Sequence, residues 1–332
     1  MSDLTVVTGA AGFIGRNTVA ELNRRGLTDL VLVDNLGHDE KWQNLRGLKY
    51  EDLVRPSELM AWLGPVGLRR VDAIVHLGAC SSTTEADADY LLENNYRFTR
   101  RLCEWALANH SRFVYASSAA TYGDGNLGYS DDDATTARLV PLNMYGYSKH
   151  MFDLWALRSG LFDRVVGLKF FNVFGPFEDH KGDMRSGVAK AYEQIAGTGS
   201  LSLFKSYRDG IADGEQRRDF IYVQDAVDVL VHFLMTRERS GLINCGTGVA
   251  RTWLDLGTAV FAAMDRTANI RFVEMPPVLQ GKYQYFTQAD TTKLRETGFE
   301  AEFLTLEQGV DRYVRDYLVP GDESRGPTQV GS

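Results

Sequence analysis

Three side chains in two short motifs have the types and spacing for proton and hydride chemistry on an alcohol. Tyr145 and Lys149 occupy positions i and i+4 of YGYSK, so in a helix they share one face. Ser118 belongs to YASSAATYG, which contains the end of an apolar run. A tyrosine that accepts a hydroxyl proton while hydride leaves the same carbon oxidises an alcohol to a ketone. These residues therefore predict a catalytic Ser/Tyr/Lys set with Tyr145 as the base.

The charge of Lys149 is large enough to make Tyr145 a useful base. A free phenol has a pKa of about 10, and lowering it to about 7 takes roughly 4 kcal/mol. One ammonium at about 4 Å supplies about 4 kcal/mol when the effective dielectric constant is near 20. We therefore expect Lys149, helped by a positively charged nicotinamide ring, to lower the pKa of Tyr145.

A glycine-rich turn near the start of the sequence predicts a dinucleotide site. In TGAAGFIG, Gly9, Gly12 and Gly15 follow an apolar run and precede a helical pattern. Such glycines allow a tight turn and close approach to a pyrophosphate, which the helix N-terminus also attracts. The GxxGxxG spacing is nearer the short-chain dehydrogenase type than the GxGxxG fingerprint. Asp34, which ends the next apolar run, can hydrogen-bond the adenosine ribose.

The residues leave the choice between NAD and NADP open. Asp34 favours the free 2'-hydroxyl of NAD, whereas the 2'-phosphate of NADP requires a cation nearby. Lys41 and Arg55 could supply that cation, although both could equally be solvated surface charges.

The sequence pattern predicts alternating strands and helices, and these elements must position the residues named above. Short apolar runs, separated by longer helical patterns, occupy residues 4–7, 30–33, 73–77, 112–116 and 165–170. This alternation predicts an α/β fold with a Rossmann-type, doubly wound parallel sheet. Gly9, Asp34, Gly78 and Ser117 each fall at the carboxyl end of a run, where such sheets bind ligands.

The second half predicts a smaller, discontinuous α/β substrate domain. Residues 205–216 are polar and without periodicity, so we expect a long loop there. A strand at 219–223, a helix at 224–236 and a strand at 241–245 are expected to return to the first sheet. The predicted domains are therefore 1–172 plus 218–246 for the cofactor and 173–217 plus 247–319 for the substrate. A disordered tail is expected over 320–332.

Composition narrows the class of protein. The chain has 332 residues, of which 44% are hydrophobic, and a net charge of -8, which argues against a nucleic-acid partner. Its start is not that of a signal peptide, and no run approaches the ~20 apolar residues that span a bilayer, so we expect a cytoplasmic protein without a membrane partner. Three cysteines without a CxxC pair suggest core thiols and neither a disulfide nor a metal site.

At the level of whole motifs, the chain resembles the ADP-L-glycero-D-manno-heptose 6-epimerases, which are extended short-chain dehydrogenases/reductases. The resemblance covers nearly the whole chain, and GACSSTTE and HKG are its most specific segments. The matching stretches are TGAAGFIG, VDNL, HLGACSSTTE, ENNY, YASSAATYG, YGYSK, FFNVFGP, HKGDM, RRDFIYV, NCGTG and GKYQYFTQAD.

The resemblance implies a reaction, its cofactor and its catalytic groups. Tightly bound NADP would oxidise carbon 6 of the ADP-heptose to a ketone and then reduce it from the opposite face, which yields a precursor of lipopolysaccharide. Inversion requires proton transfer on two sides, and the resemblance assigns the second base to Lys181. From the residues alone, Lys181 could instead be a loop cation that binds phosphate. The resemblance also implies a homo-oligomer, such as a pentamer.

The resemblance further implies the residues around each ligand. Cofactor contacts are expected from Gly9, Gly12, Phe13, Ile14, Gly15, Asp34, Asn35, Lys41, Leu77, Gly78, Ala79, Cys80, Ser81, Asn94, Lys149 and Val173. Substrate contacts are expected from Ser81, Ser118, Asn172, Asp183, Lys190, Phe204, Arg218 and Tyr283. The guanidinium of Arg218 suits a diphosphate, and Tyr283 could stack on the nucleotide or simply belong to the core.

The sequence departs from the family pattern at three places. Asp183 stands where a serine is expected, Lys190 stands where a histidine is expected, and the 205–216 loop is longer. An alternative function, 4-epimerisation of a UDP- or dTDP-hexose, would use every cofactor and catalytic residue named above. A dehydratase is disfavoured because Ala119 and Ala120 stand where dehydratases place an acidic pair. A non-catalytic NADP-binding protein would not need Tyr145 and Lys149.

Overall fold

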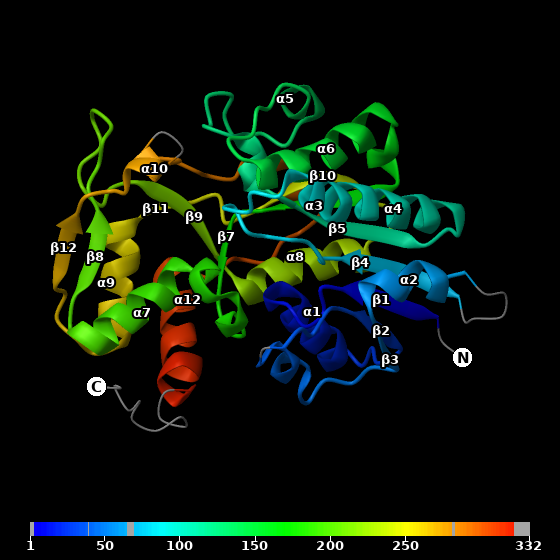
Figure 1. Ribbon diagram of the computed structural model, residues 1–332, viewed down its shortest axis with the longest axis horizontal. Helices are drawn as coiled ribbons and strands as arrows, with labels where there is room; N and C mark the ends of the chain where they lie inside the picture. Colours follow the sequence, from blue (N-terminus) through cyan, green and yellow to red (C-terminus); the bar gives the residue numbers. More distant parts are fainter. Residues whose placement is uncertain (1–2, 39, 65–69, 281–282, 322–332) are drawn as a thin grey trace.

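The fold is built around a twisted parallel sheet. The computed structural model describes residues 3–38, 40–64, 70–280 and 283–321. Seven strands, all parallel, lie in the order β10-β6-β5-β4-β1-β2-β3 (Figure 1). Their bounds are β1 Leu4–Thr8, β2 Leu30–Val33, β3 Asp52–Val54, β4 Val71–His76, β5 Arg112–Ser118, β6 Val165–Phe170 and β10 Gly241–Cys245. The five strands expected from the apolar runs are confirmed, with ends that differ by at most two residues.

Helices cover both faces of this sheet, so the fold is doubly wound as predicted (Figure 1). On one face α1 (Phe13–Arg24) and α8 (Val223–Met235) enclose a core with alternate strand residues such as Val7 and Val114. On the other face α2 (Pro56–Trp62), α4 (Phe98–Ala108) and α6 (Met144–Arg158) enclose a core that includes Phe113. Burial on both faces explains why these strands read as continuous apolar runs.

A second group of elements lies beside the carboxyl ends of the main strands (Figure 1). It contains a three-stranded sheet, β11 (Ala250–Thr252), β9 (Arg217–Tyr222) and β7 (Asn172–Phe174), and a parallel pair, β12 (Ile270–Val273) and β8 (Leu201–Phe204). Helices α7 (Gly187–Thr198), α9 (Trp253–Ala263) and α12 (Leu306–Tyr313) pack around a separate core. The remaining short helices are α3 (Ala88–Leu91), α5 (Asp133–Thr136), α10 (Pro277–Gln280) and α11 (Thr292–Glu296).

One expected strand belongs to this second group instead of the main sheet. The strand expected at 219–223 is β9, which pairs with β7 and β11, so its assignment to the first sheet was wrong. The physical reason is that the chain leaves the main sheet after β6 and forms β7, which offers a parallel partner through the register Asn172 to Phe220. Of the three elements expected to return to the main sheet, α8 and β10 do so.

Two further sequence expectations concern loops and ends. Residues 205–216 contain no helix or strand, which confirms the long loop. Most of the tail expected over 320–332 lies outside the described residues, and Pro320 and Gly321 continue the helical segment that follows α12. The two domain boundaries stay a prediction. Among the described residues, no helix has both the length and the apolar character needed to cross a membrane.

Candidate active site

A cleft of about 530 Å³ opens at the carboxyl ends of β1, β2, β4 and β5. The order of these strands places the turn after β1 between its two neighbours, which is where doubly wound sheets bind dinucleotides. Of the expected cofactor residues, the cleft is lined by Gly9, Gly12, Phe13, Ile14, Gly15, Asp34, Lys41, Leu77, Gly78, Ala79, Cys80, Ser81, Lys149 and Val173. The expected catalytic residues Ser118, Tyr145, Lys149 and Lys181 line the same cleft.

The glycines form a cradle that larger side chains would fill. Gly9 has a φ of +68°, and a Cβ there would lie 2.7 Å from the Gly78 nitrogen. A Cβ on Gly15 would lie 2.0 Å from the Gly9 oxygen. Gly12 is the N-cap of α1 and provides no capping side chain, so the first amides of the helix remain available to an anion. The residues present therefore fit a pyrophosphate.

Asp34 is fixed at the rim of this cradle. Its Oδ2 accepts a hydrogen bond from the Ala11 nitrogen at 2.8 Å. Its Oδ1 accepts from the Asn35 nitrogen at 2.8 Å and from Lys41 Nζ at 2.6 Å. Asn35 and Arg55 line an adjoining cavity that Asp34 shares, so a negative and two positive side chains surround the position expected for the adenosine ribose.

Helix α6 carries Tyr145 and Lys149 to the end of β5. Asn143 Oδ1 caps the helix by accepting from the Gly146 nitrogen at 2.8 Å. A Cβ on Gly146 would lie 2.7 Å from the Ala120 oxygen, so the glycine of YGYSK allows the helix to approach the segment after β5. Lys149 Nζ donates to the Ala116 oxygen at 2.9 Å. The helix thereby holds both side chains beside Ser118.

Burial affects the pKa values of both Tyr145 and Lys149. Exclusion of water by the surrounding protein raises the pKa of the Tyr145 phenol, and its hydrogen bond with Ser118 only partly opposes the increase. Burial lowers the pKa of Lys149 to about 8, against the attraction of Asp153. The lowering of the Tyr145 pKa expected from Lys149 together with a positively charged nicotinamide stays a prediction, and removal from water opposes it in the protein alone.

The structure separates the roles of the two adjacent serines. Ser117 Oγ donates to Asp153 Oδ2 at 2.6 Å, and Tyr115 donates to the other oxygen of the same carboxylate at 2.7 Å. Ser117 is therefore engaged in a buried network between β5 and α6. Ser118 reaches the phenol of Tyr145, which agrees with the choice of Ser118 from the sequence.

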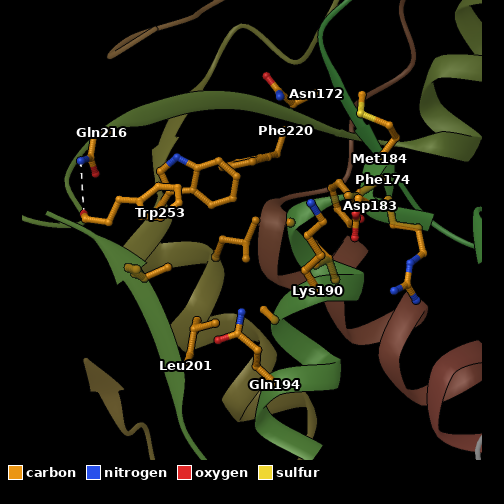
Figure 2. A pocket seen from close by; sticks show the side chains of 18 of the residues that line it. Asn172, Phe174, Asp183, Met184, Lys190, Gln194, Leu201, Gln216, Phe220 and Trp253 are labelled. Atoms are coloured by element: carbon orange, nitrogen blue, oxygen red, sulfur yellow. Dashed lines mark hydrogen bonds between the residues drawn. The ribbon is translucent and has the colours of Figure 1, made fainter. Parts of the chain in front are cut away.

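A second cavity of about 630 Å³ adjoins the cleft. Figure 2 shows residues that line this second cavity. The expected substrate residues Asn172, Asp183, Lys190, Phe204 and Tyr283 line it. Arg218 is not among its lining residues, but its guanidinium carbon lies 5.0 Å from the centre of the Tyr283 ring. Ser81 and Ser118, also expected to contact substrate, line the first cleft instead.

The wall of the second cavity also contains residues that the sequence reasoning missed. Figure 2 shows Trp253 and Phe220 on one wall and Gln194 with Lys190 on α7. Trp253 and Phe220 form an edge-to-face pair with ring centres 5.4 Å apart. Trp253 begins α9 after a strand, so no motif marked it, and only the pairing of β11 with β9 brings it beside Phe220.

The two cavities share a border formed by Phe171, Val173, Lys181 and Met184. Lys181 lies in a short 3-10 segment, Asp179–Met184, with its ammonium 5.3 Å from the centre of the Phe13 ring. Burial lowers the pKa of Lys181, Lys190 lowers it further, and Glu178 opposes both effects. Lys181 is therefore a cation with reduced proton affinity at the junction of the two cavities.

One expected contact and one expected burial differ in detail. Asn94 lines neither cavity and instead donates to Asn95 Oδ1 at 3.0 Å. The buried Asn95 holds both backbone groups of Cys80 at 2.9 Å, so it shapes the cleft from behind.

Cys103 and Cys245 are buried, as expected of core thiols, but Cys80 is half-buried on the cleft wall, where that expectation was wrong.

The fold and the glycine cradle define a Rossmann-type dinucleotide-binding protein. A family model described as the NAD dependent epimerase/dehydratase family matches residues 5–246, and the chain belongs to this family. Membership implies a nicotinamide dinucleotide cofactor.

Named relatives extend over the whole chain. The chain is 55% identical over 318 residues to the ADP-L-glycero-D-manno-heptose-6-epimerase of Nitratidesulfovibrio vulgaris strain DP4, covering 96% of this chain and 98% of that protein. It is 45% identical over 329 residues to the protein of the same name from Fusobacterium nucleatum, covering 96% and 99%.

Solved structures agree on the architecture. The ADP-L-glycero-D-manno-heptose-6-epimerase of Helicobacter pylori superposes with a TM-score of 0.78 at 25% identity, covering 95% of this chain and 96% of the other. A UDP-N-acetylglucosamine 4-epimerase from Methanobrevibacter ruminantium has a TM-score of 0.78 at 24% identity, covering 97% and 100%, which shows the fold alone.

Proposed function

We propose that this protein inverts carbon 6 of an ADP-activated heptose, converting ADP-D-glycero-β-D-manno-heptose to its L-glycero epimer for the lipopolysaccharide core. The observation that carries the proposal is the shared border of the two cavities, where Lys181 lies on the boundary and Tyr145 lines the cofactor side. A sugar bound in the second cavity can therefore present a carbon to the cofactor cleft. The names of relatives at 55% and 45% identity supply the substrate.

The nicotinamide dinucleotide, held by the glycine cradle and Asp34, supplies reversible hydride transfer when bound. Tyr145 is proposed to accept the proton of the hydroxyl at carbon 6, with Ser118 as its hydrogen-bond partner. Because the protein alone raises the pKa of Tyr145, positive charge at the bound nicotinamide must add to that of Lys149 before the phenol can ionise near neutral pH.

Lys181 is proposed as the second acid-base group. Inversion requires that the ketone be reduced on the face opposite to the one that lost hydride, so the oxygen of carbon 6 occupies two positions. Tyr145 serves one position and Lys181 the other, since both line the cofactor cleft and Lys181 also lines the second cavity. The lowered pKa of Lys181, caused first by burial, suits a group that must gain and lose a proton.

NADP is proposed over NAD. Lys41 neutralises Asp34 through a 2.6 Å ion pair, which reduces the repulsion between the carboxylate and a 2'-phosphate. Arg55 lines the adjoining cavity and offers a second cation. From the family resemblance of the sequence, the active form is proposed to be a homo-oligomer.

A time course by proton NMR tests the proposal. Purified protein without added cofactor is incubated with ADP-D-glycero-D-manno-heptose and, separately, with UDP-glucose, while the signals of the anomeric and carbon 6 protons are followed. Conversion of the heptose alone is expected, and turnover without added cofactor would show that the cofactor stays bound. Conversion of UDP-glucose alone would contradict the heptose assignment and favour a 4-epimerase.

A further inference from the structure

The segment that carries Lys181 is held at both ends by a buried carboxylate. Glu178 is fully buried immediately before the 3-10 segment Asp179–Met184. Its Oε2 accepts from the Ser186 nitrogen at 2.5 Å, and its Oε1 accepts from Ser186 Oγ at 2.6 Å. Tyr313 of α12 donates to Oε1 at 3.0 Å. One side chain thus joins both ends of the segment and ties them to the second core.

The contacts of Glu178 include two fixed donors, the Ser186 amide and the Tyr313 phenol. A backbone amide can only donate, and the phenol of Tyr313 is kept protonated because burial and the neighbouring Glu178 both raise its pKa. Burial raises the pKa of Glu178, while the hydrogen bonds from Ser186 and Tyr313 and the charge of Lys181 oppose the increase by favouring the carboxylate. Glu178 therefore links the ends of the segment, and its carboxylate form raises the pKa of Lys181.

The opposite side of the segment is held independently by the cofactor-binding half. Asn17 Nδ2 donates to the Pro176 oxygen at 3.1 Å, and Asn44 Nδ2 donates to the Ala11 oxygen at 2.9 Å while contacting His180 Nδ1 at 3.2 Å. Removing the Glu178 contacts would leave the segment attached to the glycine turn. Its exposed ends would still be tied to α7, through Arg185 with Glu193, and to the helical segment after α12, through Asp179 with Tyr317. The buried link between Glu178, Ser186 and Tyr313 would be lost.

We propose that Glu178 is the positioning residue for Lys181. Its hydrogen bonds to Ser186 and Tyr313, called the clip below, link the two ends of residues 178–186 and fix the Lys181 ammonium at the border of the two cavities. The base role of Lys181 rests on the proposed function, whereas the clip is a property of the fold. Displacement of a reacting group by about 1 Å can lower turnover on the order of 100-fold. Loss of the clip should therefore lower kcat far more than it changes KM.

The first test is a double-mutant cycle. In Glu178→Gln the amide nitrogen conflicts with one of the three donors and the charge is lost. We expect kcat to fall at least ~10-fold with KM within about twofold, and this loss to disappear in the Lys181→Met background. An equal fold-loss in both backgrounds, or an unchanged kcat, would overturn the proposal.

A matched control separates positioning from stability. Asp225 is a buried carboxylate of α8 that accepts from the Leu304 nitrogen at 2.9 Å, and it lines neither cavity. Asp225→Asn should lower thermal stability while leaving kcat near the wild-type value. If Glu178→Gln does not fold, Tyr313→Phe, which removes one donor and keeps the carboxylate, is used in the same cycle. Its smaller loss of kcat must likewise vanish with Lys181→Met, and persistence of the loss would reject the proposal.

A second readout does not depend on turnover. The rate at which an acetylating reagent modifies Lys181 is compared with that of Lys149 by peptide mass spectrometry at neutral pH. Opening the clip should expose Lys181 and remove a charge that favours its protonated form, so Glu178→Gln should raise the Lys181 rate at least ~3-fold and leave Lys149 unchanged. Equal rates in wild type and variant would overturn the positioning role even if no heptose were converted, whereas failure of the heptose assay alone would contradict only the proposed function.

Discussion

At the scale of single side chains, the surroundings of Tyr145 and Lys149 in the fold determine their chemistry more than their residue types alone. Spacing along the sequence correctly predicted that both would line one cleft. It considered charge and not burial, and burial raises the pKa of Tyr145 in the protein alone. Asn94 and Asn95 show a similar limit. Both lie in ENNY, yet of the two only Asn95 is directed to the Cys80 backbone. The residue types could not predict this, because they do not show which of the two faces the cleft.

Replacing Tyr145 with phenylalanine should abolish proton transfer and little else. We expect turnover to fall by about 10² to 10⁴ while bound cofactor remains, because the hydroxyl does not form the cradle. Steady-state kinetics and the cofactor content of the purified protein measure the two quantities. Tyr147→Phe is the matched control, since Tyr147 is two residues along α6 and 48% exposed. Normal turnover in Tyr145→Phe would remove the base assignment.

Replacing Lys181 with methionine should affect the two epimers unequally. If Lys181 serves only one of the two oxygen positions, it is the base for oxidation of one epimer and not of the other. The first, oxidative half-reaction, followed in single turnovers as reduction of the bound cofactor, should therefore slow by different factors with the D-glycero and L-glycero substrates. The exposed Lys205, paired with Glu274, offers Lys205→Met as a control that should change neither rate. An equal, modest loss of affinity for both epimers would identify Lys181 as a phosphate anchor instead.

At the scale of elements, the positions of the main-sheet strands could be predicted from the sequence, but the pairing of strands far apart in the sequence could not. The strands of the main sheet are continuous apolar runs because both faces are covered, so their positions could be recognised directly. The residues of β9 look equally strand-like, but its partner was decided by β7, and no pattern within the strand carries that information. The pairing of β12 with β8 joins segments far apart in sequence and was missed for the same reason.

The glycine turn provides a prediction for an element. Gly15→Ala would place a methyl group 2.0 Å from the Gly9 oxygen, so the turn must shift and the cradle must open. We expect cofactor content and thermal stability to fall together. Gly197→Ala is the control, because Gly197 lies in α7 with nothing within 4 Å of the added Cβ, and the change should stabilise by up to about 1 kcal/mol. Full cofactor content in Gly15→Ala would contradict the assigned turn.

His76, at the end of β4, predicts a pH dependence of stability. Its Nδ1 lies 2.7 Å from Thr8 Oγ1 and its Nε2 lies 2.9 Å from Thr99 Oγ1. Burial lowers the pKa of His76 from 6.5 to about 3, with a smaller contribution from Lys149. The unfolded chain therefore binds a proton that the folded chain does not, and stability is full above pH 6.5 and is lost as the pH falls toward 3.

The magnitude of this effect can be measured by urea unfolding. One unit below the unfolded pKa, at pH 5.5, His76 should reduce the free energy of unfolding by about 1.4 kcal/mol relative to pH 7.5. In His76→Asn this part of the difference should disappear, whereas the exposed His110→Asn should retain it. An unchanged pH dependence in His76→Asn would show that other groups cause the acid destabilisation.

At the scale of the whole molecule, the site exists because two cores meet. The main sheet supplies the cleft proposed for the cofactor, the second core supplies the cavity proposed for the substrate, and residues 171–184 form their border. The expected departures lie on this second side, since Asp183 and Lys190 both line the substrate cavity (Figure 2). Trp253 and Gln194, which no motif marked, line it too, so the general chemistry was easier to predict from the sequence than the full substrate environment.

The central claim is that inversion proceeds by oxidation and re-reduction at one carbon, with hydride held by the cofactor between the steps. The most direct measurement uses ADP-D-glycero-D-manno-heptose that carries deuterium at carbon 6, converted in ordinary water and examined by NMR. The proposed mechanism predicts that the L-glycero product keeps its deuterium at carbon 6, because the same hydride leaves and returns. Replacement of that deuterium by solvent hydrogen would contradict the mechanism and indicate direct deprotonation of the carbon.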